Sequence, residues 1–411
     1  MTDGRPLGLF EGFGIEMEFM IVDRESLAVR PIADLLLRDA GGGDTWVEDV
    51  ERGPIAWSNE IVGHLVELKT NGPASQLAGL DAAFHADVSA ANGLLAKHGA
   101  MLLGTAAHPL MDPATETRLW AHGGGEIYAS YDRIFGCSGH GWSNLQSTHL
   151  NLPFADDEEF GRLHAAIRLV LPIIPALAAS SPFLDGRFTG YLDARLETYR
   201  HNQARIPSLT GKVIPEQLFT EADYRGLLAR IAADIAPHDP GQALNPLFLN
   251  SRGAIARFDR NAIEIRTIDI QECPAADLAV IGAVVVALRR LVAEQAAPYR
   301  VQQEWPEDLL AGILLEVIRD GDQARIADGD YLRMLGLRGR SMTAGAAWRE
   351  LCETASGDFD ASSRAALGRI LDAGPLARRL LRATGTAPTR AGLVATCRAL
   401  AGCLADNRLF P

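Results

Sequence analysis

The sequence is poor in cysteine, and its cysteines follow no pattern of a disulfide framework or a zinc site. It contains five, an odd number, and no two of them form a Cys-x-x-Cys pair: Cys137, Cys273, Cys352, Cys397 and Cys403. Small disulfide-stapled domains and zinc knuckles are therefore excluded as models. A reducing cytoplasm suits such a chain, and we expect the thiols to be buried rather than nucleophilic.

Long apolar runs are also missing. Residues 1–6 include no apolar stretch of signal-peptide length, and the longest apolar run, Leu278 to Leu288, stops at Arg289 and Arg290. A bilayer span needs ~20 apolar residues. The sequence therefore predicts a soluble, cytoplasmic protein with no membrane partner.

Basic residues are fewer than acidic residues. The 411 residues include 39 Lys and Arg against 52 Asp and Glu, a formal net charge of −13. Nucleic-acid backbones and anionic membranes bind basic surfaces, so neither is an expected partner. A small anionic substrate remains compatible, because a bound metal and local arginines can reverse the field inside one cleft. The 47% hydrophobic and 22% charged residues are ordinary for a globular protein of one large or two domains.

A phosphate-binding P-loop is absent as well. The glycine-rich segments at residues 123–125 and 139–141 are not followed by Gly-Lys-Ser/Thr. We interpret both segments as loops over a cleft.

The most informative feature present is a strand-like segment, residues 14–20, with acidic residues at alternate positions. Glu16 and Glu18 would share one face, ~7 Å apart, while Ile15, Met17 and Phe19 face a core. Two carboxylates so close favour a divalent cation such as Mg²⁺ or Mn²⁺. The alternative is the charged, solvent-facing side of an antiparallel sheet.

Three further strand-like segments, residues 63–70, 147–152 and 262–268, carry similar groups. They present Glu67, His149, and the pair Glu264 and Arg266. His149 could instead be a hydrogen-bonded sheet histidine, and the pair could be a same-face ion pair without a catalytic role. Three other basic residues are interpreted as structural or rim residues: His64, Lys69 and His108.

Helical periodicity separates two regions. In the first, helices are predicted over 32–38, 77–98, 160–179 with a break at Pro172 and Pro175, and 278–296. From about Pro306, amphipathic helices are predicted over 308–319, 344–355 and 362–371, and no strand is expected. We therefore predict a mixed catalytic domain over residues 1–299 and a C-terminal helical extension, residues 300–411, packed on it.

Taken together, these motifs resemble the type 2 glutamate–cysteine ligase family. The resemblance covers about residues 10 to 298 and rests on the order of six segments: 14–19, 66–70, 104–109, 146–151, 180–190 and 262–269. It implies an α+β, glutamine-synthetase-like fold, with a curved, mainly antiparallel sheet flanked by helices. The concave face of that sheet would bind ATP, metal ions and an acid substrate.

The resemblance also implies residue roles. Six residues fall on metal-binding positions: Glu16, Glu18, Glu60, Glu67, His149 and Glu264. Arg266 and Arg195 fall on positions that contact phosphate, and with Glu67 they are the expected catalytic residues. The implied cofactors are ATP and Mg²⁺ or Mn²⁺.

The implied activity is ATP-dependent carboxylate–amine ligation through an acyl phosphate, as in glutathione biosynthesis. Glutamate is the simplest acid and cysteine the default amine, although the sequence specifies neither; a homo-oligomer is compatible with it. Two alternatives stay open: a phosphotransferase of the same fold, and an inactive metal- or nucleotide-binding regulatory protein. An amide product would separate the ligase from the phosphotransferase.

Overall fold

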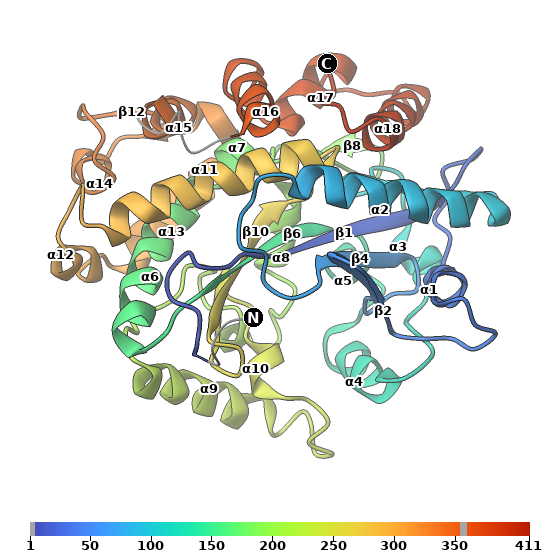
Figure 1. Cartoon of the computed structure of the whole chain (residues 1–411), viewed down its shortest axis with the longest axis horizontal. Coiled ribbons are helices and arrows are strands. Elements are labelled where there is room, and N and C mark those ends of the chain that lie inside the picture. The colour runs from blue at the N-terminus through green and yellow to red at the C-terminus, as the bar shows by residue number, and fades with distance from the viewer. Residues whose placement is uncertain (1–4, 354–359) are drawn as a thin grey trace.

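A single eight-stranded sheet forms the centre of the molecule (Figure 1). The computed structural model describes residues 5–353 and 360–411. All neighbouring strands of this sheet pair antiparallel. In spatial order they are β2 (Asp49–Arg52), β3 (Ile55–Asn59), β4 (Leu65–Thr70), β1 (Gly14–Asp23), β6 (Ser147–Pro153), β10 (Ala262–Asp269) and β9 (Ala254–Arg257), with β5 (Ala100–Leu103) paired to β1.

The two faces of the sheet differ because side chains alternate along each strand. Ile15, Met17 and Phe19 are fully buried in the main apolar core, whereas Glu16 and Glu18 emerge on the opposite face. Helices α2 (Leu80–Leu95) and α11 (Pro274–Val292) cross the apolar face (Figure 1). The antiparallel sheet with helical cover confirms the predicted α+β class.

Other helices surround this pair of layers, and α4, α9 and α10 lie on the other side of the sheet from α2 and α11 (Figure 1). The predicted break at Pro172 and Pro175 is confirmed, since α6 ends at Val170 and α7 begins at Pro175. The remaining elements before α11 are α1 (Ala33–Gly41), α3 (Pro113–Glu116), α4 (Gly125–Phe135), α5 (His140–Ser143), α6 (Asp157–Val170), α7 (Pro175–Ala178), β7 (Phe183–Leu184), β8 (Arg187–Phe188), α8 (Ala194–Tyr199), α9 (Glu221–Ile235) and α10 (Pro246–Leu249).

The C-terminal region is helical, as predicted, except for one small two-stranded sheet that the sequence did not predict. Its elements are α12 (Tyr299–Gln303), α13 (Glu307–Asp320), β11 (Arg325–Ile326), α14 (Gly329–Met334), β12 (Met342–Thr343), α15 (Ala344–Glu353), α16 (Ala361–Ala373), α17 (Leu376–Thr384) and α18 (Arg390–Ala405). The last two residues of the helix predicted over 344–355 lie outside the described residues.

These helices pack directly on the sheet domain. Trp348 of α15 is fully buried, and its Nε1 donates a hydrogen bond to the carbonyl of Ile173 at 2.6 Å. Trp348 belongs to the same apolar cluster as Ile15 of β1. The two regions therefore share one core, and the boundary near residue 299 stays a prediction.

All five cysteines lie in the described part of the chain, and each is buried with a free thiol. Among residues 5–353 and 360–411, no helix combines the length and the apolarity that a bilayer crossing requires.

Candidate active site

The polar face of the sheet carries a cleft of about 1020 Å³. All six predicted metal-binding residues line it, together with Arg266: Glu16, Glu18, Glu60, Glu67, His149 and Glu264. They come from sequence positions up to 250 residues apart, so the fold rather than local sequence brings them together. Arg195 is not among the lining residues.

Strand register explains why these side chains meet. Glu16 of β1 lies opposite His149 of β6, and Glu18 lies opposite Glu67 of β4. Glu264 of β10 lies opposite Asn151, two residues after His149. Because directly opposed residues in antiparallel strands point to the same face, each pairing adds one polar group to the cleft.

Glu16, His149 and Glu264 form the tightest group, with one potential ligand atom from each lying within 4.8 Å of the others. His149 Nδ1 is 2.9 Å from Glu16 Oε2 and 3.6 Å from Glu264 Oε1. Asn151 Nδ2 donates a hydrogen bond to Glu16 Oε1 at 3.0 Å. The two carboxylates are the oxygen donors that Mg²⁺ and Mn²⁺ prefer, and the imidazole adds a nitrogen donor at the same spacing.

The pKa values reflect this crowding. Burial lowers the pKa of His149, but the hydrogen bond to Glu16 and the charges of Glu18 and Glu264 outweigh it, so the net shift is upward. Burial likewise opposes ionisation of Glu16, but His149, Arg266 and Lys69 outweigh it and lower its pKa to about 2. The imidazole of His149 thus lies among the carboxylates of Glu16, Glu18 and Glu264.

Glu18, Glu60 and Glu67 make up a second acidic group. Burial and the charge of Glu16 raise the pKa of Glu67 to about 7, although Lys69 Nζ lies 3.3 Å from its Oε1. Burial, then Glu18 and Glu67, raise the pKa of Glu60 well above its usual range. The lining of the cleft includes more carboxyl groups than basic side chains, and this excess of acidic groups fits divalent cation binding.

Arg266 provides a guanidinium beside the first group. Its Nη2 pairs with Glu264 Oε1, and its side chain is 22% exposed to the cleft. Arg257 Nη1 lies 3.9 Å from the other oxygen of Glu264. The sequence analysis did not indicate Arg257, because it did not predict a strand over residues 254–257, which form β9. Its one indication was the short distance in sequence to the Glu264 strand.

Arg195 lies apart from the other predicted site residues. The resemblance placed it at phosphate, but its side chain is 3% exposed and turned into the protein. Its Nη1 lies 3.4 Å from Asp269 Oδ1, and its Nη2 donates to the carbonyl of Arg266 at 2.9 Å. The turn before α8 therefore brings Arg195 behind the β10 strand instead of into the cleft.

The remaining candidates divide between the cleft and the core. Lys69 lines the cleft, where it also pairs with Asp49 at 3.0 Å. His64 and His108 are buried and hydrogen-bonded to the backbone carbonyls of Ser143 and Leu27. Gly123 and Gly124 form a turn before α4, as the loop interpretation expects, whereas residues 140–141 lie in the short helix α5.

Replacing Glu16 by Gln should weaken Mn²⁺ binding at least about tenfold, because the amide offers no charge to the cation. Thermal unfolding in EDTA should occur at a lower temperature, since the low pKa of Glu16 means that its carboxylate stabilises the folded state, chiefly through His149. Calorimetric Mn²⁺ titration of both proteins measures the effect. Unchanged Mn²⁺ affinity would remove Glu16 from the site.

Comparison with known proteins gives one family match and a shared fold. A model of glutamate-cysteine ligase family 2 matches residues 12–396. An uncharacterized protein from Archaeoglobus fulgidus is 34% identical over 310 residues, which cover 75% of this chain and 80% of that protein.

Two crystal structures share the fold at low sequence identity. A glutamate–cysteine ligase from Francisella tularensis, in complex with AMP, aligns with a TM-score of 0.58 at 13% identity and covers 96% of this chain and 93% of that one. A bifunctional glutathione synthetase from Pasteurella multocida aligns with a TM-score of 0.59 at 14% identity. That alignment covers 97% of this chain but 53% of the synthetase, so this chain spans about half its length.

Proposed function

Because this chain belongs to glutamate-cysteine ligase family 2, we propose that it is an ATP-dependent ligase that joins a carboxylate to an amine. The observation that carries the proposal is the convergence of Glu16, His149 and Glu264 beside the Arg266 guanidinium in one cleft. This arrangement combines a cation site with a phosphate-binding fork. Both are parts that phosphoryl transfer requires.

The proposed chemistry follows from the fact that a carboxylate oxygen is a poor leaving group, which an amine cannot displace until the oxygen is phosphorylated. A carboxylate oxygen attacks the γ-phosphorus of ATP, the bond to the β-phosphate oxygen breaks, and ADP leaves. The amine nitrogen then attacks the acyl carbon of the acyl phosphate, the carbon–oxygen bond breaks, and inorganic phosphate leaves as the nitrogen loses a proton. Charge moves among phosphate oxygens throughout, so the protein mainly positions and neutralises.

In this proposal, each cleft residue has a defined task. Glu16, His149 and Glu264 hold one Mg²⁺ or Mn²⁺, and Glu18, Glu60 and Glu67 hold further divalent charge. Bound cations supply neutralisation of the triphosphate. Arg266 donates two parallel hydrogen bonds to the transferring phosphoryl group, a geometry that its planar fork favours.

The substrates are proposed from the family alone. Glutamate is the simplest acid and cysteine the default amine, which would place the chain in glutathione biosynthesis. The AMP held by the Francisella ligase supports an adenine nucleotide as the phosphoryl donor.

An ADP-release screen tests this function. ATP and Mg²⁺ are combined with a panel of amino acid carboxylates and a panel of amines, with and without EDTA. We expect ADP release that requires Mg²⁺, depends on one acid, and yields one amide per ADP. ADP formed with a phosphorylated acid and no amide would favour the phosphotransferase, and no ADP with any pair would favour an inactive binding protein.

A further inference from the structure

A bulge in β10 sets the position of Arg266. Ile265 pairs with Leu150 and Ile268 pairs with Thr148, so Arg266 and Thr267 together oppose the single residue His149. Such a bulge interrupts the hydrogen-bond ladder and redirects side chains. Arg266 lies beside Glu264 at the cleft, where the bulge begins, and the backbone at this point needs partners from outside the β6–β10 ladder.

Both backbone groups of Arg266 have such partners. Its N–H donates to the carbonyl of Gly253 at 3.0 Å, and its carbonyl accepts from Arg195 Nη2 at 2.9 Å. A side chain on Gly253 would not fit, because its Cβ would lie 2.5 Å from Thr267 Cγ2. The bulge is therefore held tightly on both sides.

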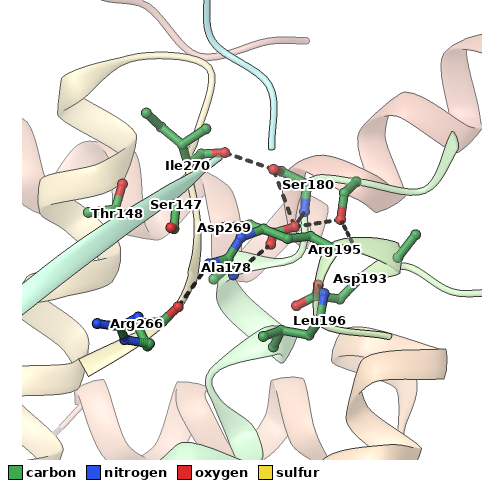
Figure 2. Close-up of polar contacts among 12 residues, drawn as sticks. Ser147, Thr148, Ala178, Ser180, Asp193, Arg195, Leu196, Arg266, Asp269 and Ile270 are labelled. Carbon is green, nitrogen blue, oxygen red and sulfur yellow. Dashed lines mark hydrogen bonds and ion pairs between the residues drawn. The ribbon is translucent and has the colours of Figure 1, made fainter. Parts of the chain in front are cut away.

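Arg195 is itself fixed by a buried polar cluster, which Figure 2 shows beside the Arg266 carbonyl. Asp269 Oδ2 accepts hydrogen bonds from the Ser180 N–H and the Ser181 hydroxyl, both at 2.8 Å. The Ser181 hydroxyl in turn accepts from the Arg195 N–H at 2.9 Å. The backbone and the guanidinium of Arg195 are thus both tied to Asp269, which is fully buried.

We propose that Arg195 is a positioning residue, which with Asp269 fixes the bulge so that the Arg266 guanidinium faces the cleft. The catalytic consequence rests on the function proposed above, because it assumes that Arg266 binds the transferring phosphoryl group. A lysine at position 195 has one compact ammonium and cannot span both Asp269 and the Arg266 carbonyl. The bulge would then loosen while the cation-binding carboxylates stayed in place.

The test compares Arg195→Lys in two backgrounds, the wild type and Arg266→Ala. In the wild type we expect kcat to fall about tenfold to hundredfold, since small displacements of a positioned group have effects of that order. Affinity for MgATP should stay within about twofold, and in the Arg266→Ala background the lysine should cause no further loss. Kinetics and calorimetric titration of MgATP measure these values.

A matched control is Arg168→Lys. Arg168 is also a fully buried arginine, and it donates to the carbonyls of Pro215 and Trp305, both at 2.8 Å, away from the cleft. Its substitution should leave kcat unchanged. If Arg195→Lys fails to fold, Ser181→Ala removes one link to Asp269 and should give the same pattern with a smaller loss.

Two kinetic results would overturn the proposal. In the first, Arg195→Lys lowers kcat by the same factor in the Arg266→Ala background as in the wild type and also weakens MgATP binding. This result would show that Arg195 contacts phosphate itself. An unchanged kcat in both Arg195→Lys and Ser181→Ala would show that the bulge needs no such support.

Hydrogen exchange separates this inference from the proposed function. Arg195→Lys should accelerate amide exchange in residues 265–269 but not in β1, whether or not the wild type releases ADP. If the wild type lacks ligase turnover, faster exchange confined to 265–269 still supports the positioning role. Unchanged exchange there would refute it.

Discussion

Replacing Arg266 by lysine is expected to lower kcat for amide formation about 100-fold, or roughly 3 kcal/mol, with little change in ATP affinity. Lysine keeps the positive charge beside Glu264 but loses the second donor of the guanidinium fork. That donor matters most where phosphate charge is greatest, in the transition state. Steady-state kinetics with saturating Mg²⁺ measures the two parameters separately.

The matched control is Arg260→Lys. Arg260 also lines the cleft, but it is 63% exposed and its nearest acidic partner, Asp259, lies 3.9 Å away. This change should leave kcat nearly unaltered. A raised Km for ATP with unchanged kcat in Arg266→Lys would instead make Arg266 a ground-state binding residue.

Replacing Arg379 by methionine is expected to reduce the free energy of unfolding by about 3–5 kcal/mol, the range for a buried ion pair that loses one partner. Arg379 and Glu272 are both fully buried, and Arg379 Nη1 lies 2.5 Å from Glu272 Oε1. The same nitrogen donates to the carbonyl of Phe410 at 2.8 Å. The pair thus anchors α17 and the C-terminal residues to the loop before α11, and urea unfolding measures its contribution.

The double variant Arg379→Met with Glu272→Gln should recover part of this loss, because the uncompensated charge is removed as well. Arg408→Met is the surface control: Arg408 pairs with Asp406 but is 54% exposed, so unfolding should hardly change. A small effect of Arg379→Met alone would contradict the expectation that this ion pair anchors the C-terminal residues.

Local sequence patterns predicted which side chains share a face of a strand, but not how the strands meet. The alternation that places Glu16 and Glu18 on one face is local, with a period of two, and the structure has it. The meeting of Glu16 with His149 depends on register between strands 133 residues apart, which local patterns do not encode. Only the order of motifs, through the family resemblance, linked them.

Two features escaped prediction for physical reasons. The β10 bulge depends on the support that Arg266 receives from Gly253 and Arg195, so no pattern within residues 262–268 indicates it. The direction of Arg195 depends on the buried carboxylate of Asp269, 74 residues later in the chain. The resemblance therefore indicated a residue near the site, but not that its side chain is buried against Asp269.

Oxygen transfer from the acid substrate to phosphate is the most direct test of ligation through an acyl phosphate in this cleft. The acid identified by the ADP-release screen, labelled with ¹⁸O in both carboxylate oxygens, is turned over with ATP, Mg²⁺ and the amine, and the phosphate is analysed by mass spectrometry. We expect one ¹⁸O in each inorganic phosphate released, because the oxygen that attacks ATP leaves with the phosphoryl group. Unlabelled phosphate alongside amide product, or label in AMP, would contradict activation of the carboxylate by γ-phosphoryl transfer.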